Sequence, residues 1–129
     1  MTMHIVGLPS FYPTAWLPQN GAFFQSHFQA LRRSGLTVGV VYCEGRPLRQ
    51  LLAPAQRARY RFQTALRDED GLPTLRRFGW DTLANSPLGG RIWVELIVRT
   101  VGLYLRTVGR PDLLHAHQAT WGGYAACQA

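Results

Sequence analysis

The sequence predicts an α/β fold, a Rossmann-like parallel sheet with helices on both of its faces. Short apolar runs alternate with segments of helical periodicity along the chain. The first two runs, Met3–Leu8 and Leu36–Tyr42, enclose one helical segment and together span about forty residues, which suits a right-handed βαβ unit. With 129 residues, 47% of them apolar and 16% charged, the chain has the length and composition of one globular domain.

The first unit contains a proline-interrupted loop and then a helix. The helix should run from Gly21 to about Arg33, with Asn20 as its N-cap. Gly35 should end the helix, and the valine-rich run that follows should be the second strand. Three apolar side chains at helical spacing should face the sheet: Phe24, Phe28 and Leu31.

The middle of the chain predicts one more helix and one more strand. Pro54 can open a helix that runs to about Arg67, and the acidic segment before Gly71 should be a turn. Thr74–Trp80 should be a third strand at the edge of the sheet, where its two arginines would be exposed. Four side chains of the helix should face inward: Ala58, Phe62, Ala65 and Leu66.

The last part predicts a long helix, a fourth strand and the start of another helix. A break around Pro87 should precede the long helix, Arg91–Val108, and Asp112–Ala116 should be the strand. Trp121–Gln128 then opens a helix too short to cover that strand, so we expect residues 1–129 to be a truncated N-terminal domain. Five side chains of the long helix should be mostly buried: Ile92, Leu96, Val101, Tyr104 and Leu105.

Positive charge is concentrated in the middle of the chain. The net charge is +7, every basic residue is arginine, and eight arginines lie between Arg46 and Arg77. Such a patch attracts phosphate groups, anionic lipid or nucleic acid. We expect weak peripheral contact with an anionic membrane and none with nucleic acid, the alternative being an ordinary solvated face. The absence of a signal-peptide pattern, an uncharged apolar span or a disulfide framework favours the cytoplasm, including the inner face of the membrane.

Two loops should meet at one edge of the sheet. The expected strand order 3-2-1-4 places strands one and four side by side, and ligands in open parallel sheets bind beyond the carboxyl ends of strands at such a switch point. The loops there are Ser10–Gly21 and His117–Gly123. The first leads into a helix N-terminus, where the N–H groups of Gly21 and Ala22 suit a phosphate, although glycine also fits a plain helix start.

The second loop begins with a His-x-His pair. His115 and His117 lie two residues apart, so in a strand both rings are on one face. Such a pair can hold zinc, but a third ligand would have to come from His4, His27 or a carboxylate, and no acidic residue is placed nearby. We therefore expect no metal and no other cofactor. His115 should line the core and hydrogen-bond a neighbouring loop, whereas His117 falls at the strand end, where a side chain meets a ligand.

Three parts of the chain resemble glycosyltransferase family 4. Pro111–His117, followed by Gly122–Ala126, resembles the acceptor-domain motif of that family. The opening strand with Phe11–Pro13 and Gln19–Phe23 is similar to the first strand and loop of the family. Gly71–Trp80 is also similar, so the resemblance spans nearly the whole chain.

The resemblance implies one half of an enzyme in which two Rossmann-like domains flank a cleft. It implies transfer of a sugar from a nucleotide-sugar donor to a carbohydrate or lipid-linked acceptor, with retention at the anomeric carbon. Gly21 would lie near the donor diphosphate, and His117 would contact the donor sugar near the reacting carbon and act in catalysis. The donor-binding second domain is absent from this sequence, so we do not expect catalysis by this chain alone. The two loops also supply residues expected to line the cleft: Tyr12, Asn20, Gln118, Trp121 and Gly122.

Two other functions fit the same residues. A non-catalytic Rossmann-like binding module would need nothing beyond the fold. A metal hydrolase built on His115 and His117 would be favoured by stoichiometric zinc. A second domain encoded downstream would favour the glycosyltransferase over both.

Overall fold

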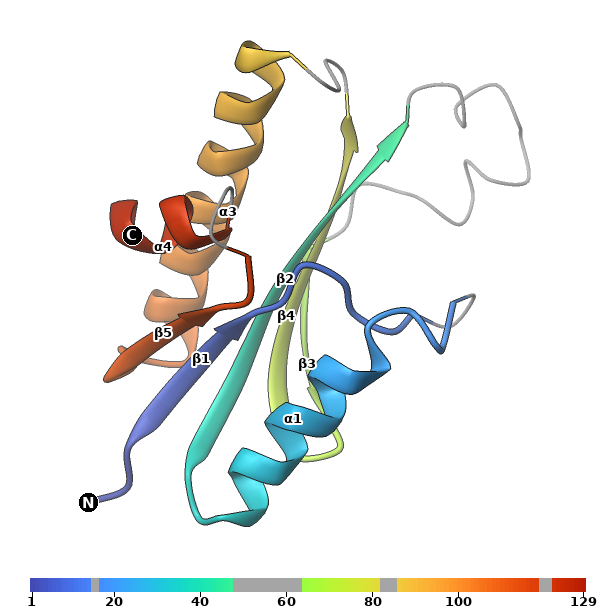
Figure 1. Cartoon of the computed structure of the whole chain (residues 1–129). Helices are drawn as coiled ribbons and strands as arrows, with labels where there is room; N and C mark the ends of the chain where they lie inside the picture. The colour runs from blue at the N-terminus through green and yellow to red at the C-terminus, as the bar shows by residue number, and fades with distance from the viewer. Residues whose placement is uncertain (15–16, 48–63, 82–85, 119–121) are drawn as a thin grey trace.

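The computed structural model describes residues 1–14, 17–47, 64–81, 86–118 and 122–129. Five strands of these residues form one sheet in the order β3-β4-β2-β1-β5 (Figure 1), and neighbouring strands are parallel except for β3 and β4. This is the predicted α/β fold, with a Rossmann-like, mostly parallel sheet and flanking helices. In chain order the elements are β1 (His4–Leu8), α1 (Ala22–Arg33), β2 (Thr37–Pro47), β3 (Thr64–Glu69), β4 (Leu72–Asp81), α3 (Pro87–Thr107), β5 (Leu113–Ala116) and α4 (Tyr124–Gln128).

The four parallel strands lie in the predicted order. β1 pairs with β2 on one side and with β5 on the other, so Val6 lies between Gly39 and Leu114. β2 pairs in turn with β4. The prediction that β4 is an edge strand is wrong, because β3 pairs with its other side.

Helices cover both faces of the sheet, as predicted. α1 lies on one face, and α3 and α4 lie on the other (Figure 1). Successive side chains of a strand point to opposite faces, so each inner strand contributes to two cores. The core beneath α1 consists of Tyr12, Phe28, Val38, Val40, Tyr42 and Leu72, with Phe24, Leu31 and Leu36 packed against it. The core beneath α3 and α4 consists of Val6, Leu8, Val41, Cys43, Leu75, Val94, Ile97, Val101, Tyr104 and Ala125.

Both ends of α1 depend on a glycine with positive φ. Gly21 is the N-cap, with φ of +71°, and no side chain caps the helix, so the prediction that Asn20 caps it is wrong. At the other end Gly35 has φ of +97°, and the Leu36 N–H donates to the Leu31 carbonyl at 3.3 Å. That bond is the mark of a Schellman motif, in which glycine avoids the steric cost of the left-handed conformation.

β3 occupies positions predicted to be the end of a helix, and this prediction is wrong. Residues 64–69 pair antiparallel with β4 through the two-residue turn Asp70–Gly71, whose φ angles are +54° and +80°. Two positive φ angles define the tight hairpin turns that favour Asp-Gly. Leu66, expected to face inward, is 42% exposed on this edge strand. The rest of the expected helix, within residues 48–63, lies outside the described residues.

An ion pair fastens β3 to β4. Arg76 was expected to be exposed, but its side chain is only 15% exposed, and its Nε and Nη2 donate to the two carboxylate oxygens of Glu69 at 2.7 and 2.9 Å. The Arg76 guanidinium also lies 4.9 Å from the ring centre of Tyr12. The Arg76 guanidinium therefore links the Glu69 carboxylate to the fully buried Tyr12 ring and stabilises this edge of the sheet.

α3 begins at Pro87, four residues before the expected start at Arg91. The Ser86 hydroxyl accepts a hydrogen bond from the Gly89 N–H at 3.0 Å, and proline fits the first helical position because that position needs no N–H donor. Ile92 was expected to be buried and is 48% exposed. The other four predicted side chains are buried or packed against the core: Leu96, Val101, Tyr104 and Leu105. Among the described residues, no helix has both the length and the apolar character needed to cross a membrane.

Two glycines let aromatic side chains press onto the central strands from opposite sides. A Cβ on Gly7 of β1 would overlap the ring of Phe28 from α1. A Cβ on Gly39 of β2 would overlap the hydroxyl oxygen of Tyr104 from α3. The two helices therefore approach the sheet at places where it has no side chain of its own.

Candidate functional site

The loops after β1 and β5 meet at the carboxyl edge of the sheet, as the strand order predicts. Leu8, the last residue of β1, is paired with Ala116, the last residue of β5. The His117 N–H donates to the Leu8 carbonyl at 3.2 Å, which carries the contact one residue beyond the strand. Gly122 lies against the same two residues, because a Cβ placed on it would be 3.8 Å from the Ala116 Cβ and 3.9 Å from the Leu8 carbonyl oxygen.

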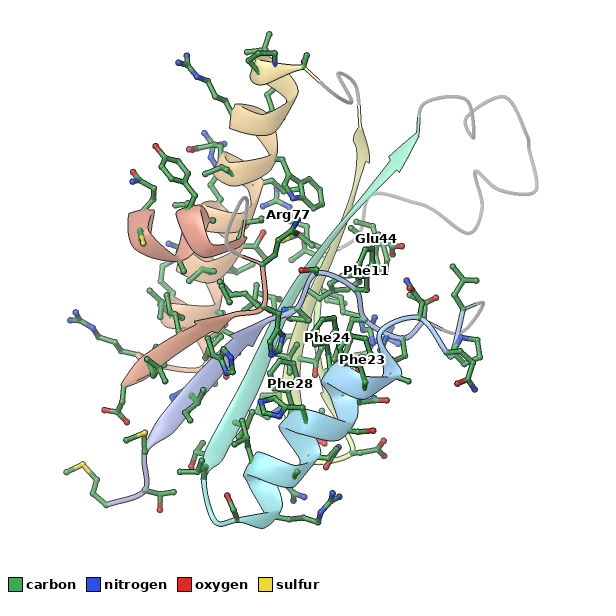
Figure 2. All side chains as sticks on the ribbon, viewed as in Figure 1. Phe11, Phe23, Phe24, Phe28, Glu44 and Arg77 are labelled. Atoms are coloured by element: carbon green, nitrogen blue, oxygen red, sulfur yellow. The ribbon has the colours of Figure 1, made fainter. Side chains whose placement is uncertain are left out.

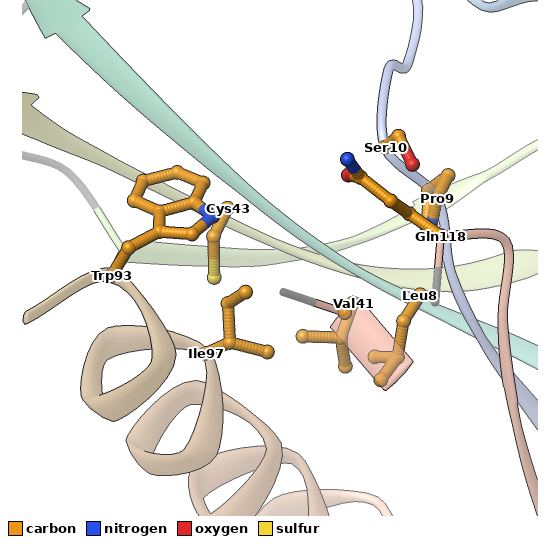
Figure 3. A pocket seen from close by; sticks show the side chains of 9 residues that line it. Leu8, Pro9, Ser10, Val41, Cys43, Trp93, Ile97 and Gln118 are labelled. Carbon is orange, nitrogen blue, oxygen red and sulfur yellow. The ribbon is translucent and has the colours of Figure 1, made fainter. Parts of the chain in front are cut away.

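A small cavity lies between these loops on the α3 side of the sheet. Its volume is about 40 Å³, room for a water molecule or two and far less than the roughly 300 Å³ of the smallest ligand pockets. Its walls include Ser10 from the first loop and Gln118 and Gly122 from the second (Figure 3). The other lining residues are Leu8, Pro9, Val41, Cys43, Trp93 and Ile97. Of the predicted cleft residues, Gln118 and Gly122 thus lie together.

Cys43 is not a reactive thiol in this setting. It is buried in the cavity wall, and desolvation raises the pKa of its thiol to about 11. Because the nucleophile is the thiolate, a thiol with so high a pKa is inert near neutral pH. We therefore assign Cys43 to the core rather than to any chemistry at the site.

The ring of His117 lies on the opposite face, beneath α1. It stacks on Phe24, with ring centroids 4.4 Å apart and planes inclined by 20°, and lies 5.1 Å from the Phe28 ring centre. Both phenylalanines come from the sheet-facing side of α1 (Figure 2). Phe24 is one turn into the helix from Gly21, and its N–H donates to the Gly21 carbonyl at 3.0 Å. The helix start and the His117 ring are thereby connected through a single residue.

His117 is held in its neutral form. Its pKa is lowered from 6.5 to about 4, first because burial disfavours the imidazolium, then because His115 and His27 lie close by. Its Nδ1 is buried and has no hydrogen-bond partner among the described residues. A neutral imidazole offers one acceptor and one donor, so this ring can bind a hydroxyl group or a metal ion but does not carry a charge near pH 7.

The first turn of α1 follows a glycine that has no room for a side chain. A Cβ on Gly21 would overlap the carbonyl of Phe11, so only glycine fits between the loop and the helix. The Ala22 N–H donates to the Gln19 carbonyl at 3.4 Å, a long and weak hydrogen bond. Two aromatic side chains beside this turn are largely exposed, Phe11 at 57% and Phe23 at 66%. Their positions were not predicted, because exposed aromatic residues look like core residues in a sequence.

The remaining predicted cleft residues have different surroundings. Tyr12 is fully buried in the core beneath α1, and burial raises its pKa to about 12. In this structure the Tyr12 side chain packs in the core and is not exposed, so it does not line a cleft. Asn20 is partly exposed, and its N–H donates to the Leu17 carbonyl at 3.1 Å within the loop. Trp121 lies outside the described residues.

A third histidine joins the His-x-His pair. His27 of α1 lies 5.6 Å from His115 and 5.7 Å from His117, measured between ring centres, and the two strand histidines are 4.6 Å apart. Among the described residues His115 makes these ring contacts and pairs with Gly7 in the sheet, and the expected side-chain hydrogen bond to a neighbouring loop is absent there. Helical spacing contained a signal for His27, because it is three residues after Phe24 and so borders the apolar stripe.

Comparison with known proteins relates the chain to one glycosyltransferase. It is 29% identical over 132 aligned positions to the Bacillus subtilis (strain 168) protein described as "Putative teichuronic acid biosynthesis glycosyltransferase TuaC". The alignment covers 96% of this chain and 32% of that protein, so the chain spans about a third of the length of this relative. No protein-family model and no solved structure matches the chain. The chain is therefore a Rossmann-like α/β domain with distant similarity, over nearly its whole length, to a glycosyltransferase.

Proposed function

We propose that this chain is the N-terminal, acceptor-side domain of a two-domain glycosyltransferase of the family 4 type. The enzyme would transfer a sugar from a nucleotide-sugar to a carbohydrate or lipid-linked acceptor with retention at the anomeric carbon. The observation that carries the proposal is the similarity across 96% of the chain, which includes both loops that meet at the ends of β1 and β5. That edge is where open parallel sheets bind ligands.

The proposed donor diphosphate site is the start of α1. The N-terminus of a helix carries a partial positive charge, and its first N–H groups point outward toward an anion. The hydrogen bond from the Ala22 N–H to the Gln19 carbonyl is long, at 3.4 Å, and therefore weak. A phosphate oxygen can replace this carbonyl as the acceptor at low cost. The left-handed Gly21 has no side chain, and this allows the Phe11 carbonyl to pack against the start of the helix.

The proposed role of His117 is to hold the donor sugar in a reactive pose. Breaking the bond between sugar and phosphate develops positive charge on the ring and negative charge on the leaving diphosphate, so a cation beside the sugar would be unfavourable. The neutral imidazole of His117 avoids this and can hydrogen-bond a sugar hydroxyl. Stacking on Phe24 fixes the plane of the ring, which makes the contact directional. We assign no general-base role to His117; the leaving phosphate takes the proton of the acceptor.

The other parts of the reaction would come from the rest of the enzyme. The chain spans only 32% of its relative, and in the proposed architecture the second domain holds most of the nucleotide-sugar. Gln118 and Gly122, beside the small cavity, and the exposed Phe11 and Phe23 would then face the acceptor side of a cleft completed by that domain.

The test uses the intact natural protein that contains this chain. Donor binding and donor hydrolysis are measured with a panel of nucleotide-sugars, and His117→Ala is compared with His4→Ala. His4 lies at the start of β1, at the opposite edge of the sheet, so its loss should leave turnover near that of the unaltered enzyme. We expect His117→Ala to lower kcat by roughly 100-fold, the loss of one positioned contact in the transition state. Failure to bind any nucleotide-sugar, or full turnover in His117→Ala, would remove the proposal.

A further inference from the structure

Three histidines from two separate elements gather on the α1 face of the sheet. We name His27, His115 and His117 the histidine cluster. Each offers one ring nitrogen such that the three nitrogens lie within 4.8 Å of one another. Histidine is a scarce residue here, four in 129, and three of the four are in this cluster.

The fold rather than the sequence order creates the cluster. His115 lies in β5 and His117 directly follows the last residue of that strand, and the alternation of side chains places both rings on one face. α1 lies across that face, and its Phe24 stacks on His117. His27, one turn further along the same side of α1, is thereby placed edge-on to both strand histidines, at interplanar angles of 85° and 71°.

We propose that the histidine cluster binds one transition-metal ion of the zinc class, with one imidazole nitrogen from each residue as a ligand. Two nitrogens bound to one tetrahedral zinc ion are separated by roughly 3.3 Å, given Zn–N bonds of about 2.0–2.1 Å. His27 is exposed, so rotation of its side chain can bring its ring nitrogen closer to those of His115 and His117. A fourth position would remain for water or another oxygen ligand.

The donor set selects the class of metal. Three neutral imidazoles suit zinc, copper, nickel or cobalt, whereas magnesium and calcium prefer oxygen ligands. The group that could hold an ion contains the three histidines and no carboxylate among the described residues. An ion of this class is therefore expected, zinc serves as its probe, and magnesium should not compete with it.

The state of His117 gives the cluster a reason to bind a metal. Its buried Nδ1 lacks a hydrogen-bond partner among the described residues. A buried polar atom without a partner is unfavourable, and a bond to a metal ion, or the reorientation that accompanies it, would relieve this. The phenylalanine rings on one side of His117 exclude water and so favour ligands that the protein itself supplies.

The proposal is independent of the glycosyltransferase function. It needs no donor sugar and is read without any turnover. Should both hold, the metal and the sugar would use the same His117 ring, and each would weaken binding of the other.

The experiment measures metal binding by the intact, untagged protein after removal of metals with a chelator. Zinc is titrated by calorimetry, and cobalt is titrated by absorption, because its visible bands report tetrahedral coordination. The variants are His27→Ala, His115→Ala and His117→Ala, with His4→Ala as the matched histidine control. His27 is exposed, so His27→Ala should fold as the unaltered protein does.

We expect one zinc ion per chain that depends on the cluster. Each cluster variant should lose affinity by more than the roughly 10–100-fold that follows loss of a group merely supporting a ligand, and His4→Ala should lose none. Zinc should raise Tm in the unaltered protein and in His4→Ala but not in His27→Ala. Equal zinc binding by the unaltered protein and His27→Ala, or no binding by either, would overturn the proposal. Neither outcome affects donor binding, so the two proposals fail separately.

Discussion

The ring of Phe24 stacks on the ring of His117, with centroids 4.4 Å apart and planes inclined by 20°. This contact joins the first turn of α1 to the end of β5, the two places that the proposed donor would touch. An aromatic pair of this kind contributes about 0.5–1.5 kcal/mol beyond the area it buries. Its larger effect should be on orientation, because within the described part of the chain the Nδ1 atom of His117 makes no hydrogen bond that would fix the ring.

Replacing Phe24 tests whether it is a positioning residue. In the intact enzyme, Phe24→Leu should lower kcat by about tenfold with a smaller change in KM, because the His117 ring would sample unproductive orientations. Phe24→Tyr keeps the ring and should restore most of the turnover. If both variants lose the same activity in proportion to their loss of stability, the stack is only packing.

Acid should destabilise the metal-free domain through His117. Its folded-state pKa of about 4 lies below the ordinary 6.5, so between these values the unfolded chain binds the extra proton. The stabilisation is complete above about pH 6.5 and is lost as the pH falls toward 4. The shift corresponds to roughly 3 kcal/mol, which solvent access to the partly exposed ring reduces to about 1–2 kcal/mol.

The measurement is urea unfolding between pH 7 and pH 4 in the presence of a chelator. Carboxyl groups also titrate in this range, so the free energy of unfolding is compared with that of His117→Asn at each pH. The difference between the two proteins should shrink steadily on acidification. A difference that does not change with pH would show that His117 is not held neutral by the fold.

Gly21→Ala should destabilise the loop that carries the proposed phosphate site. A Cβ there meets the backbone carbonyl of Phe11, and φ of +71° is unfavourable for alanine, so we expect a loss of about 2–4 kcal/mol. Gly35→Ala is the control, because its φ is also positive but, apart from its chain neighbours, no described residue has an atom within 4 Å of the added Cβ. That variant should lose about 1–2 kcal/mol, the conformational part alone. Equal losses in both proteins would mean that the contact with Phe11 relaxes freely.

Arg76→Met should weaken the hairpin of β3 and β4. It leaves the partly buried Glu69 carboxylate without its bidentate partner, at a cost of about 1–3 kcal/mol in the free energy of unfolding. Arg99→Met removes the exposed pair with Glu95 on α3 and should change stability by less than about 0.5 kcal/mol. Urea denaturation of the two variants gives the comparison, and a loss as small in Arg76→Met as in Arg99→Met would contradict the assigned role.

The parallel part of the fold could be predicted from the sequence, and the hairpin could not. β1, β2 and β5 are short apolar runs between turn-forming residues, and the periodicity of α1 is clear. β3 reads as a helix because Ala65 and Leu66 continue an apolar spacing that starts earlier in the chain. The Asp70–Gly71 dipeptide was the local signal for a hairpin. The sequence predicts a start of α3 that is four residues too late, because Pro87 and the glycines after it are typical of a break between elements.

The site could be predicted only in its outline. The meeting of the two loops follows from the strand order, and the shared face of His115 and His117 follows from strand geometry. Helical spacing places His27 beside the apolar stripe of α1, but its distance from His115 and His117 depends on how α1 packs on the sheet. Tyr12 shows the opposite difficulty, because a tyrosine in the loop after a parallel strand resembles a ligand contact until its full burial is seen.

The pressing of Phe28 onto Gly7, and of Tyr104 onto Gly39, has a consequence for how this domain can change over evolution. At each place the large aromatic side chain fills the volume that a side chain on the glycine would need. The glycine therefore cannot be replaced by a larger residue unless the aromatic residue changes as well. A homologue with alanine or valine at position 7 should carry a smaller residue at position 28, and positions 39 and 104 should change together in the same way. The two pairs lie on opposite faces of adjacent strands, so each pair should covary internally and vary independently of the other.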